Sequence, residues 1–213
     1  MQLSEIREEV QLIMQDNDVF ISDIVDGYIN EIYFSTVSEC LVPELKGVDV
    51  VTATVSQAYV QLSGVSGGFS GVLSRVYNSS NESVEIVNSL ETLMDLYGSL
   101  ADTGDIVAVA LEGSTLWYCQ LPAVSEVLTV IYYKNPVLLV NDEDTPLYIP
   151  DFLHRRILVN GAAAVCFDLV EDEKDTTKVN TRSRENAKLE GVVKFKEWLG
   201  KTRKHYIYSQ EEY

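Results

Sequence analysis

The interval between hydrophobic positions changes twice along this chain. Between residues 18 and 41, apolar side chains recur every three or four positions, which is typical of an amphipathic helix, and Pro43 ends the pattern. After Gly47 the interval becomes two, as in strands that bury one face. Beyond Pro150 the helical interval returns. The pattern therefore predicts helices at both ends of the chain and a sheet between them.

A shorter helix is predicted before the first long one. Ser4 is a residue type that accepts hydrogen bonds from the first backbone N–H groups of a helix. Ile6, Val10 and Ile13 then share one helical face, up to about Gln15. We expect a short amphipathic helix here, separated from the next by a polar break.

The central residues 47–135 predict a β-rich unit. A stretch rich in Gly and Ser, Gly64–Gly71, separates two runs of β-branched residues and is expected to be a flexible hairpin loop. Asn88 followed by Glu91 predicts a capped short helix that ends at Gly98. Further strands are predicted at 106–111, 115–121 and 127–133, the first two forming a hairpin. The usual strand length gives about five or six strands.

The stretch 131–167 joins the β-rich and helical parts. It begins as a strand, breaks at Pro136 and crosses an acidic connection. A helix over 152–170 follows, with small residues that permit close approach of another helix. A last long helix is predicted over 177–204, with Val179, Leu189, Val192, Val193, Phe195, Trp198 and Leu199 on its apolar side.

Together these elements predict an α+β fold. A helical bundle formed by the N- and C-terminal helices would carry an inserted β-rich domain, sandwich-like or barrel-like, because insertions are tolerated at surface loops. The predicted helical core comprises residues 1–46 and 136–204, the inserted domain 47–135, and a C-terminal tail 205–213 that is expected to order only on a partner.

Charge is distributed unevenly along the chain, whose net charge is −17. Residues 1–46 carry ten acidic and two basic side chains, residues 47–135 nine and two, and residues 136–213 fourteen and twelve. Within the last part, residues 174–204 carry ten basic and four acidic side chains. Because affinity for phosphate comes mainly from Lys and Arg, an acidic body argues against tight nucleic-acid binding. The sequence predicts a basic helix on an acidic body.

The sequence offers little for catalysis. Only His154 and His205 could serve as imidazole bases, and neither stands in a nucleophile-elbow context. His154 is expected to be solvated or at an interface, and His205 to complement a helix dipole. Gly64–Gly71 lacks the Gly-Lys-Ser/Thr ending of a phosphate loop. We therefore predict a protein that is not an enzyme and that has no cofactor.

Metal binding and disulfides are also not expected. The contiguous carboxylates of 142–144 are interpreted as solvated charge, with cation binding as the less favoured alternative, because they lack the alternating spacing of a calcium loop. Cys40, Cys119 and Cys166 are odd in number and have apolar neighbours, which predicts buried thiols. No apolar run is long enough to span a membrane, and the N-terminus is charged, so the chain is expected to stay in the cytoplasm where it is made.

The order of these elements resembles the head-to-tail adaptor, or connector, proteins of tailed bacteriophages. The resemblance is close over residues 131–167 and extends in outline over most of the chain. The segments that carry it are Tyr28-Ile29-Asn30-Glu31-Ile32-Tyr33, Tyr132-Tyr133-Lys134-Asn135-Pro136, Asn141-Asp142-Glu143-Asp144-Thr145-Pro146 and Ile149-Pro150-Asp151-Phe152-Leu153-His154.

This resemblance implies a structural virion protein that assembles as a ring, commonly of twelve copies, under the portal. Such a ring would extend the DNA channel and link the capsid vertex to the tail during assembly and genome ejection. Its partners would be the portal protein, a downstream tail, stopper or nozzle protein, and other copies of itself, with double-stranded DNA passing through without specific binding. It would reside in the host cytoplasm during assembly and then at the head-tail interface of the virion.

The basic last helix and the tyrosine-rich tail are the candidate docking segment for the portal or a neighbouring subunit, since interfaces favour Tyr and Arg. The candidate partner-binding residues are Lys201, Arg203, Lys204, His205, Tyr206, Ile207, Tyr208 and Tyr213.

Two other classes of function remain open from the residues alone. One is a β-rich glycan-binding or receptor-binding module on a helical stalk, with Trp117, Tyr118 and Tyr77 as a stacking platform, although alternating aromatic residues in strands are more often core. The other is a hydrolase that uses Cys166 or Cys119. The apolar surroundings of Cys166 argue against it, because they would raise the thiol pKa.

Overall fold

The computed structural model of the chain describes residues 1–14, 19–98, 100–169 and 175–210, except for the side chains of 19–23, 169, 175–180 and 203–210. Contacts between residues divide the chain into two compact units. The helical unit comprises Met1–Val42 and Pro136–Tyr213, and the strand-rich unit comprises Pro43–Asn135.

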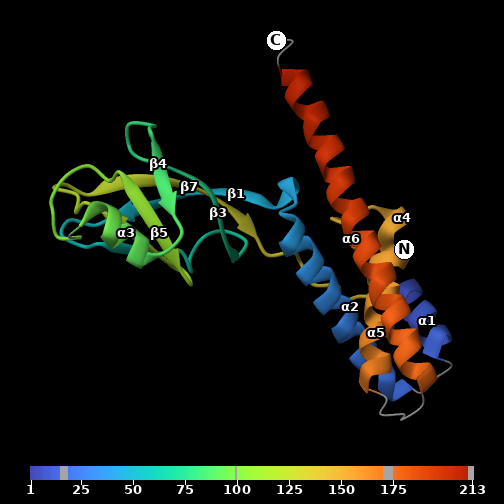
Figure 1. The fold of residues 1–213 in the computed structure, drawn as a ribbon. Coiled ribbons are helices and arrows are strands. Elements are labelled where there is room, and N and C mark those ends of the chain that lie inside the picture. The colour runs from blue at the N-terminus through green and yellow to red at the C-terminus, as the bar shows by residue number, and fades with distance from the viewer. Residues whose placement is uncertain (15–18, 99, 170–174, 211–213) are drawn as a thin grey trace. The chain divides into compact units, whose positions relative to one another are not determined.

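The helical unit is built from helices that pack against one another (Figure 1). In chain order they are α1 (Leu3–Met14), α2 (Val19–Cys40), α4 (Asp151–His154), the π-helix η2 (Arg155–Val159), α5 (Asn160–Leu169) and α6 (Asp175–Gln210). Helix α5 packs along α6 and against α2, and α1 packs against α2 and α5.

Apolar side chains at helical intervals form the core of this unit. Leu3, Ile6 and Val10 occupy one face of α1 and are fully buried. Completely buried residues from the other helices are Val25, Ile29, Val37, Ile157, Leu158, Val159, Ala162, Ala163 and Phe195. Burial of each large aliphatic or aromatic side chain contributes about 1.5–3 kcal/mol, so this shared core holds the helices together.

Helix α1 begins one residue before the predicted cap. The backbone N–H groups of Leu3 and Ser4 donate to the carbonyl oxygens of Asp144 (2.8 Å) and Asp142 (3.2 Å). The Ser4 hydroxyl also donates to the carbonyl of Asp142, at 3.1 Å, so the predicted Ser4 cap is wrong. A distant turn of the chain thus satisfies the first N–H groups of the helix, which would otherwise lack partners.

A π-helical turn interrupts the helix that the sequence predicts over 152–170. Such a turn disturbs the regular hydrogen-bond ladder of an α-helix. The Asn160 side-chain amide donates to the carbonyl of Arg155 at 3.0 Å, and Arg184 of α6 donates to Asn160 Oδ1 at 3.0 Å. A polar bridge from α6 therefore supports the irregular turn.

The strand-rich unit contains one seven-stranded sheet with the order β1-β7-β3-β4-β5-β6-β2. Its elements are the 3₁₀ turn η1 (Pro43–Leu45), β1 (Lys46–Ala53), β2 (Tyr59–Gln61), β3 (Phe69–Tyr77), β4 (Ser83–Val87), α3 (Leu90–Tyr97), β5 (Ala108–Glu112), β6 (Thr115–Cys119) and β7 (Glu126–Lys134). The neighbouring strands are antiparallel except β4 and β5, which are parallel and have α3 between them in the chain. A parallel pair needs such a crossover segment.

Alternation along β7 shows how the sheet forms its core. Leu128, Val130 and Tyr132 are fully buried, whereas the intervening Thr129 and Ile131 are only partly buried. At one end of the long β1–β7 pairing, Lys46 stands opposite Tyr133. The strand-rich unit therefore begins and ends on neighbouring strands.

The α+β class predicted from the sequence is confirmed, and several boundaries are corrected. The sheet has seven strands instead of five or six. Ser89, and not Asn88, caps α3 by accepting from the Thr92 N–H at 3.1 Å, while Gly98 ends that helix as predicted. Helix α6 continues to Gln210, into the segment predicted as a tail.

Two glycines permit close helix packing in the helical unit. A Cβ added at Gly161 of α5 would lie 2.8 Å from Ile32 Cγ2 of α2, and one at Gly191 of α6 would lie 2.8 Å from Ile157 Cγ1. By contrast, a Cβ at Gly27 of α2 would meet nothing within 4 Å. The small residues predicted to allow close approach do so at Gly161.

We predict opposite effects for two Gly→Ala substitutions in this unit. Gly161→Ala should lower the free energy of unfolding by about 1–3 kcal/mol, because a buried core must shift to accept the methyl group. Gly27→Ala should raise it by about 0.5–1 kcal/mol, because Ala loses less backbone entropy in a helix. Urea denaturation followed by helical circular dichroism measures both, and equal stability of the two variants would contradict the packing described.

Candidate interaction surface on the helical unit

The segment 136–150, called the connection, lies against α2 without regular secondary structure. Asn30 of α2 holds its backbone from both sides of Leu139: the Asn30 amide donates to the Leu139 carbonyl at 2.9 Å, and the Leu139 N–H donates to Asn30 Oδ1 at 2.8 Å. The same amide nitrogen also donates to the Asp26 carbonyl at 3.0 Å. One side chain therefore fixes the position of the connection on the helix.

Arg7 joins three segments of the helical unit. Its guanidinium donates to both carboxylate oxygens of Asp26 on α2, from Nε at 2.7 Å and from Nη2 at 2.6 Å. The same Nη2 lies 2.9 Å from Asp142 Oδ1 in the connection. The Asp26 and Asp142 carboxylates raise the pKa of Arg7. This fork geometry links α1, α2 and the connection.

Two of the three residues of the acidic cluster 142–144 have a structural role. Asp142 pairs with Arg7, and Asp144 accepts from the backbone N–H groups of Asn141 (2.8 Å) and Val140 (2.7 Å), which hold the pKa of Asp144 below its ordinary value. No group of three or more His, Cys, Asp or Glu side chains within the described residues is arranged to hold a metal ion. The carboxylates thus shape the turn that receives the start of α1.

His154 is buried, so the prediction of a solvated or interface histidine is wrong. Its Nε2 lies 2.7 Å from the carbonyl of Ile149, and its Nδ1 lies 3.2 Å from the Met1 amino group. Burial is the main cause that lowers the pKa of this imidazole. His154 therefore holds the end of the connection against the helix that follows it.

The three cysteines are buried thiols, as predicted. Burial raises the pKa of the Cys166 thiol to about 11, which leaves little thiolate at neutral pH. Cys119 belongs to the apolar core beneath β5 and α3. The hydrolase alternative therefore has no activated nucleophile at Cys166.

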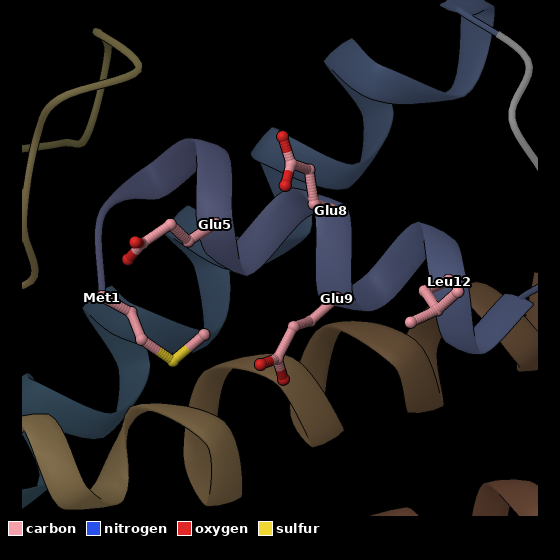
Figure 2. A pocket seen from close by; sticks show the side chains of 5 residues that line it. All are labelled: Met1, Glu5, Glu8, Glu9 and Leu12. Carbon is pink, nitrogen blue, oxygen red and sulfur yellow. The ribbon is translucent and has the colours of Figure 1, made fainter.

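Helix α1 presents an acidic surface beside Met1 (Figure 2). Glu5, Glu8, Glu9 and Leu12 lie along it and line a shallow hollow with Met1. Glu9 pairs with Arg155 at 2.9 Å, and Glu5 accepts from the Gln2 N–H at 2.8 Å. These two carboxylates thus hold helix segments in place.

Large apolar side chains of the connection face solvent although its backbone is held. The exposed fractions of Val137, Val140 and Leu147 are 76%, 76% and 80%. Leu138 and Leu147 line a hollow of about 290 Å³ together with Tyr33, whose ring stacks on Tyr148 at 6.5 Å between centroids. Exposed apolar side chains beside a hollow are a feature of interaction surfaces, which makes this part of the connection the candidate surface.

Helix α6 buries one face and exposes another. Val192, Phe195 and Leu199 are buried as predicted, whereas Leu189 and Val193, predicted on the apolar side, are exposed. At about 100° per residue, Val193 lies about 160° and Leu189 about 120° from Phe195 around the helix, so both fall outside the buried face. Lys196 pairs with Glu39 of α2 at 2.7 Å and helps to fix α6 in place.

The predicted partner-binding residues lie at the far end of α6. Lys201 is exposed. The side chains of the other candidates lie outside the described part: Arg203, Lys204, His205, Tyr206, Ile207, Tyr208 and Tyr213.

The proposed glycan platform does not form a continuous exposed surface. Tyr118 is fully buried, and its hydroxyl donates to the Tyr59 carbonyl at 3.3 Å. Trp117 is half-buried and packs against the Tyr59 ring at 5.1 Å between centroids. Tyr77 lies on β3 and accepts from Arg75 at 3.3 Å. The aromatic residues of this unit thus serve mainly its own packing.

The Gly- and Ser-rich stretch 64–71 is held at its centre. The Ser66 N–H donates to the Asp49 carboxylate at 2.9 Å, and the Tyr132 hydroxyl donates to the Ser66 carbonyl at 2.6 Å. Both contacts tie the loop to the β1–β7 pair. The prediction of a hairpin loop is wrong, because β2 and β3, which this stretch joins, do not pair with each other. The stretch is a linking segment that Ser66 ties to the sheet.

Sequence reasoning missed the two residues that fix the connection. Asn30 lies on the same helical face as Tyr33 and Val37, where a polar residue in an apolar stripe signals a buried hydrogen bond. Arg7 is one of two basic residues among the first 46, so its pairing with a carboxylate could have been expected. Two of their partners could not be predicted from the sequence. Leu139, the partner of Asn30, and Asp142, a partner of Arg7, each lie more than 100 residues further along the chain.

We predict that Asn30→Ala lowers the free energy of unfolding of the helical unit by about 1–3 kcal/mol, because the buried Leu139 N–H and carbonyl lose their partner. Asn186→Ala, at an exposed position of α6, is the matched control and should change it by less than about 0.5 kcal/mol. Chemical denaturation measures both values. Equal effects of the two substitutions would contradict the role assigned to Asn30.

The described residues contain no helix that is both long and apolar enough to cross a membrane. Comparison with curated proteins finds no match. Comparison with protein families finds the SU10 adaptor protein family, whose model matches residues 1–193. This range covers the whole of the strand-rich unit, the whole of the connection and most of the helical unit. The chain therefore belongs to the SU10 adaptor family and is a structural adaptor protein of a bacteriophage.

Proposed function

We propose that this adaptor assembles as a ring under the portal, commonly of twelve copies, where it extends the DNA channel and links the capsid vertex to the tail during assembly and genome ejection. The observation that carries the proposal is the family match over residues 1–193. In this view the chain folds in the host cytoplasm and then joins the head-tail interface of the virion.

Within this proposal the helical unit is the ring-forming core and the strand-rich unit is an inserted domain. The helical unit has the rigid framework that a ring subunit needs, because Arg7 and Asn30 tie both of its chain segments together. The division of the chain after Val42 and before Pro136 supports an insertion between two helical segments. The inserted domain is then free to face outward or to contact the tail.

The distribution of charge supports passage of DNA without binding. The net charge is −17, and the first 135 residues carry 19 acidic and four basic side chains. An acidic channel lining repels phosphate, whereas bound DNA would stall transport. The basic side chains concentrate on α6, which we assign to protein contacts.

We predict that deleting residues 201–213 abolishes binding to portal rings and leaves the chain folded. Among the described side chains of α6, those that enter the core, such as Phe195 and Leu199, precede Lys201. Co-sedimentation with portal rings measures binding, and circular dichroism checks the fold. A full-length Lys194→Glu chain, altered at an exposed α6 position before the deleted segment, is the control and should still bind. Unchanged binding of the truncated chain would refute the docking role of this segment.

We also predict weak affinity of the assembled ring for double-stranded DNA at physiological salt. Fluorescence anisotropy of a labelled duplex, measured over a salt series, tests this. A channel that repels phosphate should give little binding and a shallow salt dependence. Tight binding that weakens steeply as salt rises would overturn the proposed lining.

A further inference from the structure

The sheet of the strand-rich unit packs its core on one side, and its own residues cover only part of the other side. Leu128 and Val130 of β7 face the core. On the opposite, outer side, α3 covers β4, β5 and β6, where Ala108 is buried beneath it. On the outer side of β1, by contrast, Val48 and Val50 are 63% and 58% exposed. Half of the outer side therefore has a helix on it and half does not.

The register of β1, β7 and β3 defines this uncovered face. Side chains that stand directly opposite one another on paired strands point to the same side of a sheet. Val48 of β1, Ile131 of β7 and Arg75 of β3 thus form one row across the three strands. The side chains that dominate the uncovered face are Lys46, Val48 and Val50 of β1, Val127 and Ile131 of β7, and Arg75 of β3.

The uncovered face is positively charged although its unit is acidic. Residues 43–135 carry ten acidic and three basic side chains. Two of the three basic side chains, Lys46 and Arg75, stand on the uncovered face, where the register places no carboxylate. Lys46 lies over the Tyr133 ring at 5.5 Å from its centroid, and Arg75 donates to the Tyr77 hydroxyl at 3.3 Å. Neither forms an ion pair with a described residue, so both charges are available to a partner.

Helix α3 presents the opposite charge together with apolar side chains. The side of α3 away from the buried Leu93 exposes Glu91, Met94, Asp95 and Leu96. At about 100° per residue, these four lie between about 100° and 300° from Leu93 around the helix. The strands beneath α3 add no positive charge, because no Lys or Arg occurs between Arg75 and Lys134. This outward side of α3 is therefore acidic and apolar.

The dimensions of the two surfaces also agree. Helix α3 has eight residues, and at 1.5 Å per residue it is about 12 Å long. The outer two of three neighbouring strands lie about 10 Å apart. Glu85 of β4, at the border of the uncovered face, accepts from the Tyr97 hydroxyl of its own α3 at 2.6 Å, which keeps this carboxylate engaged. A helix of this length fits the uncovered face without meeting a free carboxylate on it.

We infer that α3 of one copy docks, by its outward side, on the uncovered face of a second copy. Its methionine and leucine then meet the valines of that face, and its two carboxylates meet the two positive charges. Because the two surfaces are different parts of one unit, the contact is heterologous, and repeated contacts of this type close into a ring when the rotation allows. The inference rests on the proposed ring in taking a second copy as the occupant.

Cross-linking between two full-length chains with single added cysteines tests this contact. One chain carries Val50→Cys and the other carries Met94→Cys. A short bismaleimide joins thiols only across a close contact, and the native cysteines are at most 7% exposed. Val193→Cys replaces Val50→Cys in the control, because Val193 of α6 is similarly exposed (55%). Both mixtures are treated alone and with portal rings, each variant by itself gives the background, and mass spectrometry identifies the linked peptides.

Charge reversal gives a second measurement that includes a rescue. Arg75→Glu and Asp95→Arg should each weaken self-association about fivefold or more, because each places like charges across the contact. The double variant Arg75→Glu/Asp95→Arg reverses both sides of every contact and should recover most of this loss. Lys194→Glu, at an exposed position of α6, should leave association unchanged. Sedimentation velocity measures association, and circular dichroism confirms that each variant is folded.

Four outcomes are distinguishable. Cross-linking of the 50/94 mixture well above the 193/94 mixture, together with loss and rescue of association, supports the inference. Loss of association in Arg75→Glu without the selective 50/94 cross-link overturns α3 as the occupant, because another part of the second copy then covers the face. Self-association that neither charge reversal affects overturns this interface and leaves the proposed ring intact. Absence of any self-association, alone or on portal rings, overturns both.

Discussion

The hydrogen bonds between Asn30 and the backbone of Leu139 are the constraint on which the helical unit depends most. They hold the connection, which has no regular backbone hydrogen bonds of a helix or strand, against the long helix α2. Arg7 then adds charged contacts from α1 to Asp26 and Asp142. These partners come from both chain segments of the helical unit, so the polar contacts add to the apolar core in holding the two segments together. They also fix the backbone of the connection and with it the side chains that stay exposed.

Much of the fold could be predicted from the period of its apolar residues. The long helix from Val19 to Cys40 and the sheet between the helices follow from periods of 3.6 and 2, which reflect local geometry. The Ser4 cap and the solvated His154 were wrong because their partners, Asp142 and Ile149, come from the connection, whose course the local pattern does not encode. Burial of a polar group depends on such distant partners.

The candidate surface was harder to predict than the fold. Leu189 and Val193 are apolar like the buried Phe195, and the prediction from the sequence placed all three on one side of the helix. The packing of α6 on α5 and η2 shows which side of the helix is buried, and the helical period then places Leu189 and Val193 outside it. The same holds for Leu147, whose exposure follows from the fixed backbone of the connection. For an adaptor protein, apolar residues that the fold leaves uncovered carry more information about partners than its few ionisable groups.

The pairing of Lys46 with Tyr133 affects how the chain folds. It brings the two ends of residues 43–135 together, so a folded sheet presents the remaining chain with a short, closed junction instead of a long flexible loop. The entropy cost of joining the two helical segments should fall accordingly, by roughly 3 kcal/mol for a loop of about 93 residues reduced to a few. Early formation of the sheet would then speed the folding of the helical unit. Substitutions that weaken the pairing of β1 with β7 would slow this folding, although they change no contact between helices.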